Sequence, residues 1–134
     1  MSAEIRSCRM PFLCPECSCR GSLRVVLRIE LPPDSRSDEI ALQTVECSNC
    51  GFAGIAVYEE SRRGSLDEET FHHTGYHLPR SDLQDLRRAI RSCPDPANSR
   101  CRCSAHQVLS QADASGRWNV LHDLHTTEAF PIEK

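Results

Sequence analysis

The chain has 134 residues, the usual size of one domain, which excludes a large multidomain enzyme. Sixteen basic and nineteen acidic residues give a formal net charge of −3, and neither half of the chain forms a basic platform for nucleic acid. Hydrophobic residues make up 39% of the sequence but aromatic residues only 5%, so we expect a small apolar core that contributes little stability by itself. The nine cysteines therefore indicate that metal ions or disulfides supply part of the stability.

The choice between metal and disulfides depends on the compartment. The first residues contain no apolar run typical of a signal peptide, and apolar stretches such as residues 55–58 are far too short to span a bilayer. We therefore expect a cytoplasmic protein without a membrane segment. In a reducing cytosol, cysteines clustered at short spacings are usually metal ligands, so the sequence favours metal.

Residues 1–60 are predicted to form a small antiparallel sheet. Three segments have the apolar, β-branched character of strands: residues 23–31, 40–46 and 52–60. In the first of them Leu27, Ile29 and Leu31 alternate with polar residues, which places the three on one face. The polar segment 32–38 contains two prolines and is expected to end this strand.

Two C-x-x-C motifs flank the first two predicted strands, and they contain Cys14, Cys17, Cys47 and Cys50. Each motif bends the chain tightly enough to direct two sulfur atoms inward, and a hairpin between the motifs brings the pairs together. We predict a zinc ribbon with four thiolate ligands; buried free thiols or a redox pair are the alternatives. Such a closed site leaves no position for water, so its role is to fold the module.

This segment resembles the zinc ribbon of the zinc finger protein 1-like (zpr-type) family. Those domains run C-x-x-C, a glycine, a basic and apolar strand, a proline turn, an apolar strand and C-x-x-C-G; here the places are held by Cys14, Cys17, Gly21, Arg24, 25–31, Pro32, 39–40, Cys47, Cys50 and 51–52. The match departs in the turn, where residues 32–37 replace an aromatic pair, and the larger β-domain that follows in the family is lacking. The resemblance implies a chaperone or adaptor that binds a translation factor.

Residues 66–134 are predicted to form a second small module that contains helix, after a polar linker. Ser81 and Gln84 have the form of a capping box, and apolar residues then recur at helical spacing until Pro94. Weaker patterns predict further elements: a strand or loop at 71–78, two helical turns at 104–111 and a short strand at 117–124. The predicted fold class is therefore α+β.

Three thiols and an imidazole follow the predicted helix: Cys93, Cys101, Cys103 and His106. Three thiolates and one imidazole are a common donor set for zinc, and we predict a second zinc site on this loop. The alternatives are a cysteine-rich loop without metal and an iron–sulfur or open catalytic site. Two zinc ions per chain are therefore the expected cofactors.

The remaining cysteines and a histidine group have less defined roles: Cys8, Cys19, His72, His73 and His77. In a strand His73 and His77 share a face, so a metal-dependent enzyme that uses this region is one functional alternative. Ordinary surface or core histidines are the simpler interpretation. The phosphate-binding, dinucleotide-binding and hydrolase motifs are missing, which makes an enzyme the least favoured class.

The leading functional hypothesis is a non-catalytic, cytosolic zinc-binding adaptor that binds another protein. It depends on the acidic charge, the missing catalytic motifs and the metal-stabilised scaffold. The alternative is a nucleic-acid-binding zinc ribbon of the transcription or translation machinery, because Arg20, Arg24 and Arg28 lie four residues apart. In a strand this spacing places all three on one face.

Overall fold

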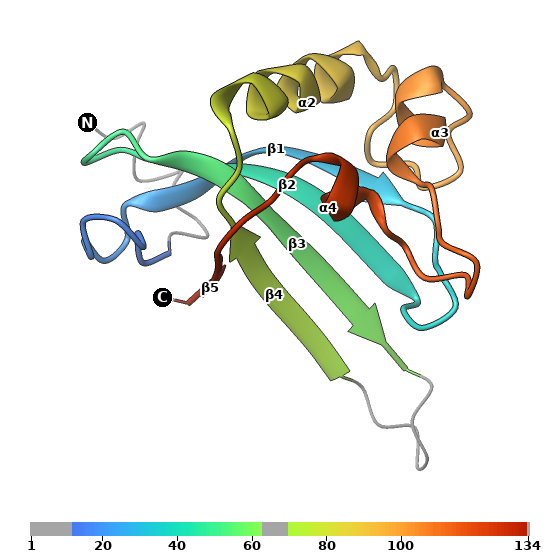
Figure 1. Cartoon of the computed structure of the whole chain (residues 1–134), viewed down its shortest axis with the longest axis horizontal. Helices are drawn as coiled ribbons and strands as arrows, with labels where there is room; N and C mark the ends of the chain where they lie inside the picture. Colours follow the sequence, from blue (N-terminus) through green and yellow to red (C-terminus); the bar gives the residue numbers. More distant parts are fainter. Residues whose placement is uncertain (1–11, 63–69, 134) are drawn as a thin grey trace.

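The structure is a computed structural model that describes residues 12–62 and 70–133. The sheet has five antiparallel strands in chain order: β1 Leu23–Leu31, β2 Glu39–Cys47, β3 Ala53–Ser61, β4 Thr70–Tyr76 and β5 Ala129–Pro131. The helices α2 Arg80–Ser92, α3 Ser104–Leu109 and α4 Val120–Asp123 lie against one face of it (Figure 1). The predicted α+β class is confirmed.

The sheet continues beyond the three strands expected from the first module. β1, β2 and β3 correspond to the three predicted strands, and β4, predicted as a strand or loop at 71–78, pairs with β3 from Ser61↔Thr70 to Ile55↔Tyr76. β5, for which the sequence offered no pattern, pairs with β4. The two expected modules, 1–60 and 66–134, therefore contribute strands to one sheet.

The main core lies between the sheet and its helices. From the strands it contains Ile40, Leu42, Ile55 and Val57, and from α2 it contains Leu83, Leu86 and Ile90. Alternate residues of the strands thus pack against helix residues that are spaced three or four apart, as in an amphipathic helix. Full burial of each such side chain contributes about 1.5–3 kcal/mol, so this layer holds α2 on the sheet.

A smaller cluster lies on the opposite face, at the end of the sheet where β1 begins. Its buried members are Phe12, Cys14, Leu23, Val45, Cys47, Ala56 and Phe130. Gly75 of β4 lies beneath Phe130: a Cβ atom there would be 2.2 Å from Phe130 Cε2. Only glycine permits this approach, which lets the Phe130 ring hold β5 against β4.

β1 changes face at a β-bulge. Its register with β2 shifts between Val25 and Leu27, so the strand carries one extra residue there. Leu23 and Val25 pack with the smaller cluster, whereas Leu27, Ile29 and Leu31 pack with the main core. The predicted alternation from Leu27 onward is confirmed, and the bulge lets one strand contribute to both sides of the sheet.

The predicted capping box of α2 is wrong. The helix begins at Arg80, and its N-cap is Pro79, which makes no side-chain cap hydrogen bond. Proline has the fixed φ that an extended N-cap residue needs, here −60°. Ser81 is therefore a helical residue with an exposed side chain.

In the second half of the chain, the structure confirms one of the two short elements predicted from the sequence and contradicts the other. α3 confirms the helical turns expected at 104–111. The strand expected at 117–124 is wrong, because this segment forms α4 and one isolated bridge. Trp118 is buried in the main core, where its Nε1–H donates to Leu109 O at 2.7 Å. This tertiary contact holds the segment away from the sheet.

Candidate metal centres

The four cysteines of the predicted ribbon converge where β1 begins. The sulfur atoms of Cys14, Cys17, Cys47 and Cys50 all lie within 4.8 Å of one another. Cys14 Sγ is 3.6 Å from Cys50 Sγ, and Cys17 Sγ is 3.7 Å from Cys47 Sγ. A tetrahedral zinc ion with bonds of about 2.3 Å needs sulfur separations of about 3.8 Å, so the group fits zinc.

Backbone turns direct these sulfur atoms inward. Ser18, with φ 60°, and Gly51, with φ 83°, adopt the left-handed conformation where the two turns close. The N–H of Glu16 donates to Cys14 Sγ at 3.4 Å. The N–H groups of Asn49 and Cys50 both donate to Cys47 Sγ at 3.3 Å. Hydrogen bonds of this kind favour the thiolate form, which is the form that binds metal.

The thiols of this group ionise at different pH values. Burial raises the pKa of Cys14 to about 12. Burial acts in the same direction on Cys47, but a hydrogen bond with the Ser22 side chain and those from the Cys50 and Asn49 backbones outweigh it and lower the pKa of Cys47 to about 6. A bound zinc ion removes this difference, because a coordinating thiol is deprotonated outright.

The second group lies at the other end of β1, on the loop between α2 and α3 (Figure 1). The donor atoms of Cys93, Cys101, Cys103 and His106 all lie within 4.8 Å of one another. Cys93 Sγ is 3.8 Å from Cys101 Sγ and 3.1 Å from His106 Nδ1, and Cys103 Sγ is 3.4 Å from the same nitrogen. A tetrahedral zinc ion needs edges of about 3.5–3.8 Å. The sulfur–sulfur separation matches this range, and the two sulfur–nitrogen separations are shorter than it.

A hydrogen bond on the far side of the ring orients His106, which is only 2% exposed. Its Nε2 lies 2.9 Å from Glu30 O. Because a carbonyl oxygen only accepts, Nε2 carries the proton and Nδ1 presents its lone pair to the sulfur atoms. The loop before α3 is also bonded to β1, because Pro96 O accepts the Glu30 N–H at 2.7 Å, so the edge of the sheet anchors this loop.

The start of α3 places two donors of this group. Cys103 is the N-cap of the helix, and its sulfur accepts the His106 N–H at 3.3 Å. This hydrogen bond lowers the pKa of Cys103 to about 6, whereas burial raises that of Cys93 to about 11. Each of the two groups thus contains a buried thiol whose pKa is raised beside at least one thiol whose pKa is lowered.

The three arginines expected to form one face do not share a face, and this expectation is wrong. Arg20 lies in the turn before β1. In the register of β1 with β2, Arg24 lies opposite Glu46 and Arg28 lies opposite Gln43. Glu46 and Gln43 are separated by an odd number of residues along β2, so their side chains point to opposite faces of the sheet, and the two arginines opposite them do the same. The bulge between the two arginines is the physical cause.

The three histidines proposed for a catalytic metal have different neighbours. His73 Nε2 lies 2.7 Å from Gln43 Oε1, and burial together with Arg28 lowers the pKa of His73. The His77 ring contacts Phe52 and Phe130, and His72 is exposed. No metal-ligand group found among residues 12–62 and 70–133 includes any of the three histidines.

Of the two leftover cysteines, only Cys19 lies in the described part of the chain, and it joins neither group. Cys8 falls outside the described residues. Cys19 is a free, partly exposed thiol whose Sγ lies 4.0 Å from Arg20 O. The first group therefore uses Cys17 rather than Cys19, as the C-x-x-C spacing predicts.

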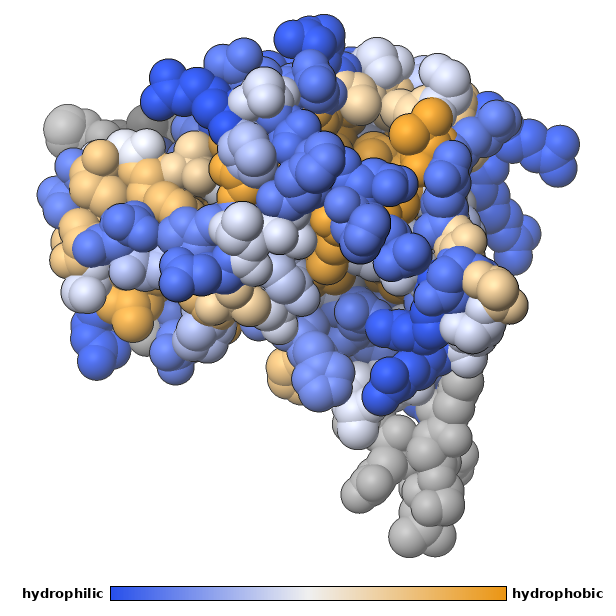
Figure 2. Space-filling model, in the orientation of Figure 1, coloured by the Kyte–Doolittle hydropathy of each residue, from blue (hydrophilic) through white to orange (hydrophobic). Residues whose placement is uncertain are grey.

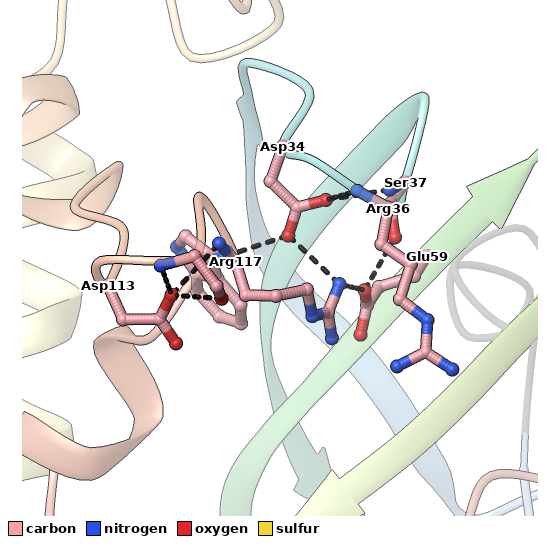
Figure 3. A network of polar contacts seen from close by, with 8 residues as sticks. Asp34, Arg36, Ser37, Glu59, Asp113 and Arg117 are labelled. Carbon is pink, nitrogen blue, oxygen red and sulfur yellow. Dashed lines mark hydrogen bonds and ion pairs between the residues drawn. The ribbon is translucent and has the colours of Figure 1, made fainter.

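A buried carboxylate that the sequence did not indicate ties the β1–β2 turn to the segment after α3 (Figure 3). Asp34 accepts hydrogen bonds from the backbones of Arg36 and Ser37 through Oδ1, at 2.8 and 2.6 Å. Its Oδ2 accepts from Trp118 N at 2.8 Å and from Arg117 Nη1 at 3.0 Å. Burial opposes ionisation, but these donors outweigh it and lower the pKa of Asp34.

Comparisons of the chain with protein family models, with curated proteins and with solved structures give no match. The resemblance to zpr-type ribbons therefore stays a prediction. In the part of the chain that the structure describes, no helix has the length and apolar character to cross a membrane. The two groups of metal-binding side chains themselves carry the functional conclusion.

Proposed function

We propose that the protein is a non-catalytic, zinc-stabilised adaptor of the cytoplasm that binds another protein. The observation that carries this proposal is the number of donors, because each of the two groups supplies four side-chain ligands at tetrahedral spacing. Catalytic zinc sites usually have three protein ligands and one open position, whereas structural sites have four. Zinc at both groups therefore stabilises the fold, and the protein acts through its surface.

The energetics of zinc agree with this role. A structural zinc ion in a small module contributes on the order of 10 kcal/mol of apparent binding free energy. The whole stability of a typical domain is about 5–15 kcal/mol. Two such ions make a rigid scaffold from a chain with few aromatic residues, and a rigid surface binds a partner at a lower entropic cost.

The charge distribution counts against the nucleic-acid alternative. The net charge is −3, and the arginines at 24 and 28 lie on opposite faces of the sheet. Affinity for a phosphate backbone needs several cations on one surface. The enzyme alternative needs a metal-ligand group around His72, His73 or His77, and no such group among residues 12–62 and 70–133 includes any of the three.

Crosslinking mass spectrometry with the zinc-loaded chain as bait in a nuclease-treated extract tests the proposed function. The adaptor proposal predicts reproducible protein crosslinks that disappear when a chelator removes the zinc. In parallel, fluorescence anisotropy should detect no binding of mixed-sequence DNA or RNA at low salt. Oligonucleotide binding that weakens steeply with added salt, with partner capture lost after nuclease treatment, would contradict it.

A further inference from the structure

The last strand of the sheet, β5, lies beside the first metal group, although the two are far apart in the sequence. The N–H of Leu13, the residue before Cys14, donates to Glu133 O at 2.7 Å. In Figure 1 the end of the chain lies next to the turn that carries the first C-x-x-C motif. Figure 2 shows apolar surface gathered at this end of the molecule. The segment that follows β5 is thus bonded to the residue that precedes a metal ligand.

The Phe130 ring of β5 also contacts the turn of the second C-x-x-C motif. Phe130 is 8% exposed and belongs to the same buried cluster as Cys14 and Cys47. Its ring centroid lies 5.7 Å from that of Phe52, at an interplanar angle of 75°. Phe52 O accepts the Cys47 N–H at 2.8 Å, so the Phe52 backbone closes the turn that positions Cys47 and Cys50. Through Leu13 and Phe52, the segment around β5 is in contact with both metal-binding turns.

β5 is a short strand with a single buried side chain. It consists of three residues, of which only Phe130 is buried, and it pairs with β4 at three positions. Hydrogen bonds of residues 127, 128 and 132 with His77 and His73 flank this pairing. A strand of this length at a sheet edge has little stability of its own. The position of β5 therefore depends on the Phe130 ring and on the turns that this ring contacts.

The two turns in turn depend on the metal. Each has one buried cysteine, Cys14 or Cys47, and one that is at least partly exposed, Cys17 or Cys50. The latter two have little packing of their own, so the ion is what joins the turns to each other. A structural zinc ion contributes folding free energy directly, and its loss frees the segments that it joins. The turns therefore offer Phe130 a firm contact surface only when zinc is bound.

We propose that the first metal group and β5 form a zinc-dependent latch on the sheet. Zinc holds both turns against β5 and keeps β5 on β4, and loss of zinc releases β5 and uncovers the edge of β4. An uncovered strand edge pairs readily with an extended segment, so zinc occupancy controls whether the adaptor presents this edge. The proposal rests on the zinc that the proposed function assigns to this group, and it adds a regulation of that function.

The coupling must be reciprocal, because two linked equilibria change each other by the same factor. If zinc holds β5 in place, β5 must also raise the zinc affinity of the first group. The second metal group is an internal control for this effect. Cys93 belongs to the main core, and Cys101 and Cys103 pack against that core rather than against the smaller cluster that contains Phe130.

A zinc titration that resolves the two groups in the full chain tests the effect of β5 on zinc. The protein is equilibrated with a zinc chelator over a series of concentrations, and a brief alkylation pulse with mass spectrometry identifies the cysteines that have lost zinc. Phe130→Ala should raise the free zinc concentration at half occupancy at least tenfold for the first group and less than twofold for the second. Phe71→Ala is the matched control and should change both less than twofold, because Phe71 is an exposed ring of β4 that stacks on Tyr58.

Hydrogen exchange tests the effect of zinc on β5. In Cys50→Ser, which lacks a ligand of the first group, residues 129–132 should exchange at least tenfold faster, while residues 41–43 and 55–57 of the sheet stay protected. In Cys101→Ser, which lacks a ligand of the second group, residues 129–132 should exchange as in the wild type.

Three results would overturn the latch: an unchanged first group in Phe130→Ala, an equal shift of both groups in that variant, or exchange in Cys50→Ser that is either unchanged in β5 or fast throughout the sheet. Native mass spectrometry of the wild type separates these failures from failure of the proposed function. Zinc at both groups without coupling to β5 would overturn the latch alone. A wild type without zinc at the first group would contradict the zinc-stabilised scaffold itself.

Discussion

At the second metal group, a backbone carbonyl decides how the imidazole is presented. Glu30 O accepts the Nε2–H of His106 at 2.9 Å, which leaves Nδ1 as the atom that faces Cys93 and Cys103. Outer partners of this kind determine both the tautomer and the ring orientation of a metal-binding histidine. His106 thus presents a donor nitrogen to the sulfur atoms on one side and links to the edge of the sheet on the other.

The variant His106→Gln tests this dual role. Removal of one of four donors should lower the zinc content from two ions to one and reduce the free energy of unfolding by about 3 kcal/mol or more. Native mass spectrometry and urea denaturation measure the two effects. The control His72→Gln changes an exposed histidine outside both groups and should keep both ions. Two zinc ions retained in His106→Gln would show that His106 is not a ligand.

Asp34 is the other residue whose surroundings make a quantitative prediction. Its side chain is 4% exposed and accepts four hydrogen bonds, so Asp34→Asn should cost about 1–3 kcal/mol at pH 7. Its pKa is lower in the folded protein than in the unfolded chain. Asp34 therefore contributes its full stabilisation above about pH 4, and loses it as the pH falls through the folded value.

The expected signature is a difference in unfolding free energy between wild type and Asp34→Asn that is constant near neutrality and shrinks below about pH 4. Urea denaturation across this range measures it. Asp85→Asn removes an exposed ion pair with Arg88 and should cost less than about 0.5 kcal/mol. A loss in Asp34→Asn as small as that control would mean that the carboxylate does not tie the turn to residues 117–118.

Among the elements, β5 depends on one close contact with β4. A Cβ atom at position 75 would lie 2.2 Å from the Phe130 ring, so Gly75→Ala should displace β5 and destabilise the protein by about 1–3 kcal/mol. Hydrogen exchange of residues 129–132 should speed up in this variant. In a Phe130→Ala background the same substitution should cost little, because the clashing ring is gone. An equal cost in both backgrounds would place the strain elsewhere.

At the start of α2 we expect a substitution that hardly changes the stability. Because Pro79 is the N-cap and the Ser81 side chain makes no cap hydrogen bond, Ser81→Ala should change the unfolding free energy by less than about 0.5 kcal/mol. Thermal unfolding followed by circular dichroism measures this difference. A loss of about 1 kcal/mol, which is typical of a removed cap, would show that Ser81 caps the helix after all.

Local patterns predicted the elements whose side chains repeat with a clear period. β1, β2, β3, α2 and the ligands of both metal groups follow from alternation, helical spacing and cysteine spacing. The bulge in β1, the pairing of β5 and the position of Trp118 depend on partners that are distant in sequence. Glu30 and His106, for example, are 76 residues apart, and a backbone carbonyl has no signature in the sequence.

At the scale of the whole molecule, the two metal groups lie at the two ends of β1. The first group belongs to the smaller cluster through Cys14 and Cys47, and the second belongs to the main core through Cys93. The ends of the strand are roughly 25 Å apart, a distance at which the effects of substitutions usually add. Each zinc ion should therefore stabilise its own side of the sheet, and loss of one should leave the other in place.

Native mass spectrometry of freshly purified protein counts these ions directly. We expect two zinc ions per chain in the wild type, one in Cys101→Ser, one in Cys50→Ser and none when both substitutions are combined. The single variants should keep the thiols of the untouched group protected from alkylation. One zinc ion in the wild type, with Cys93, Cys101 and Cys103 all open to alkylation, would contradict the two-site structure.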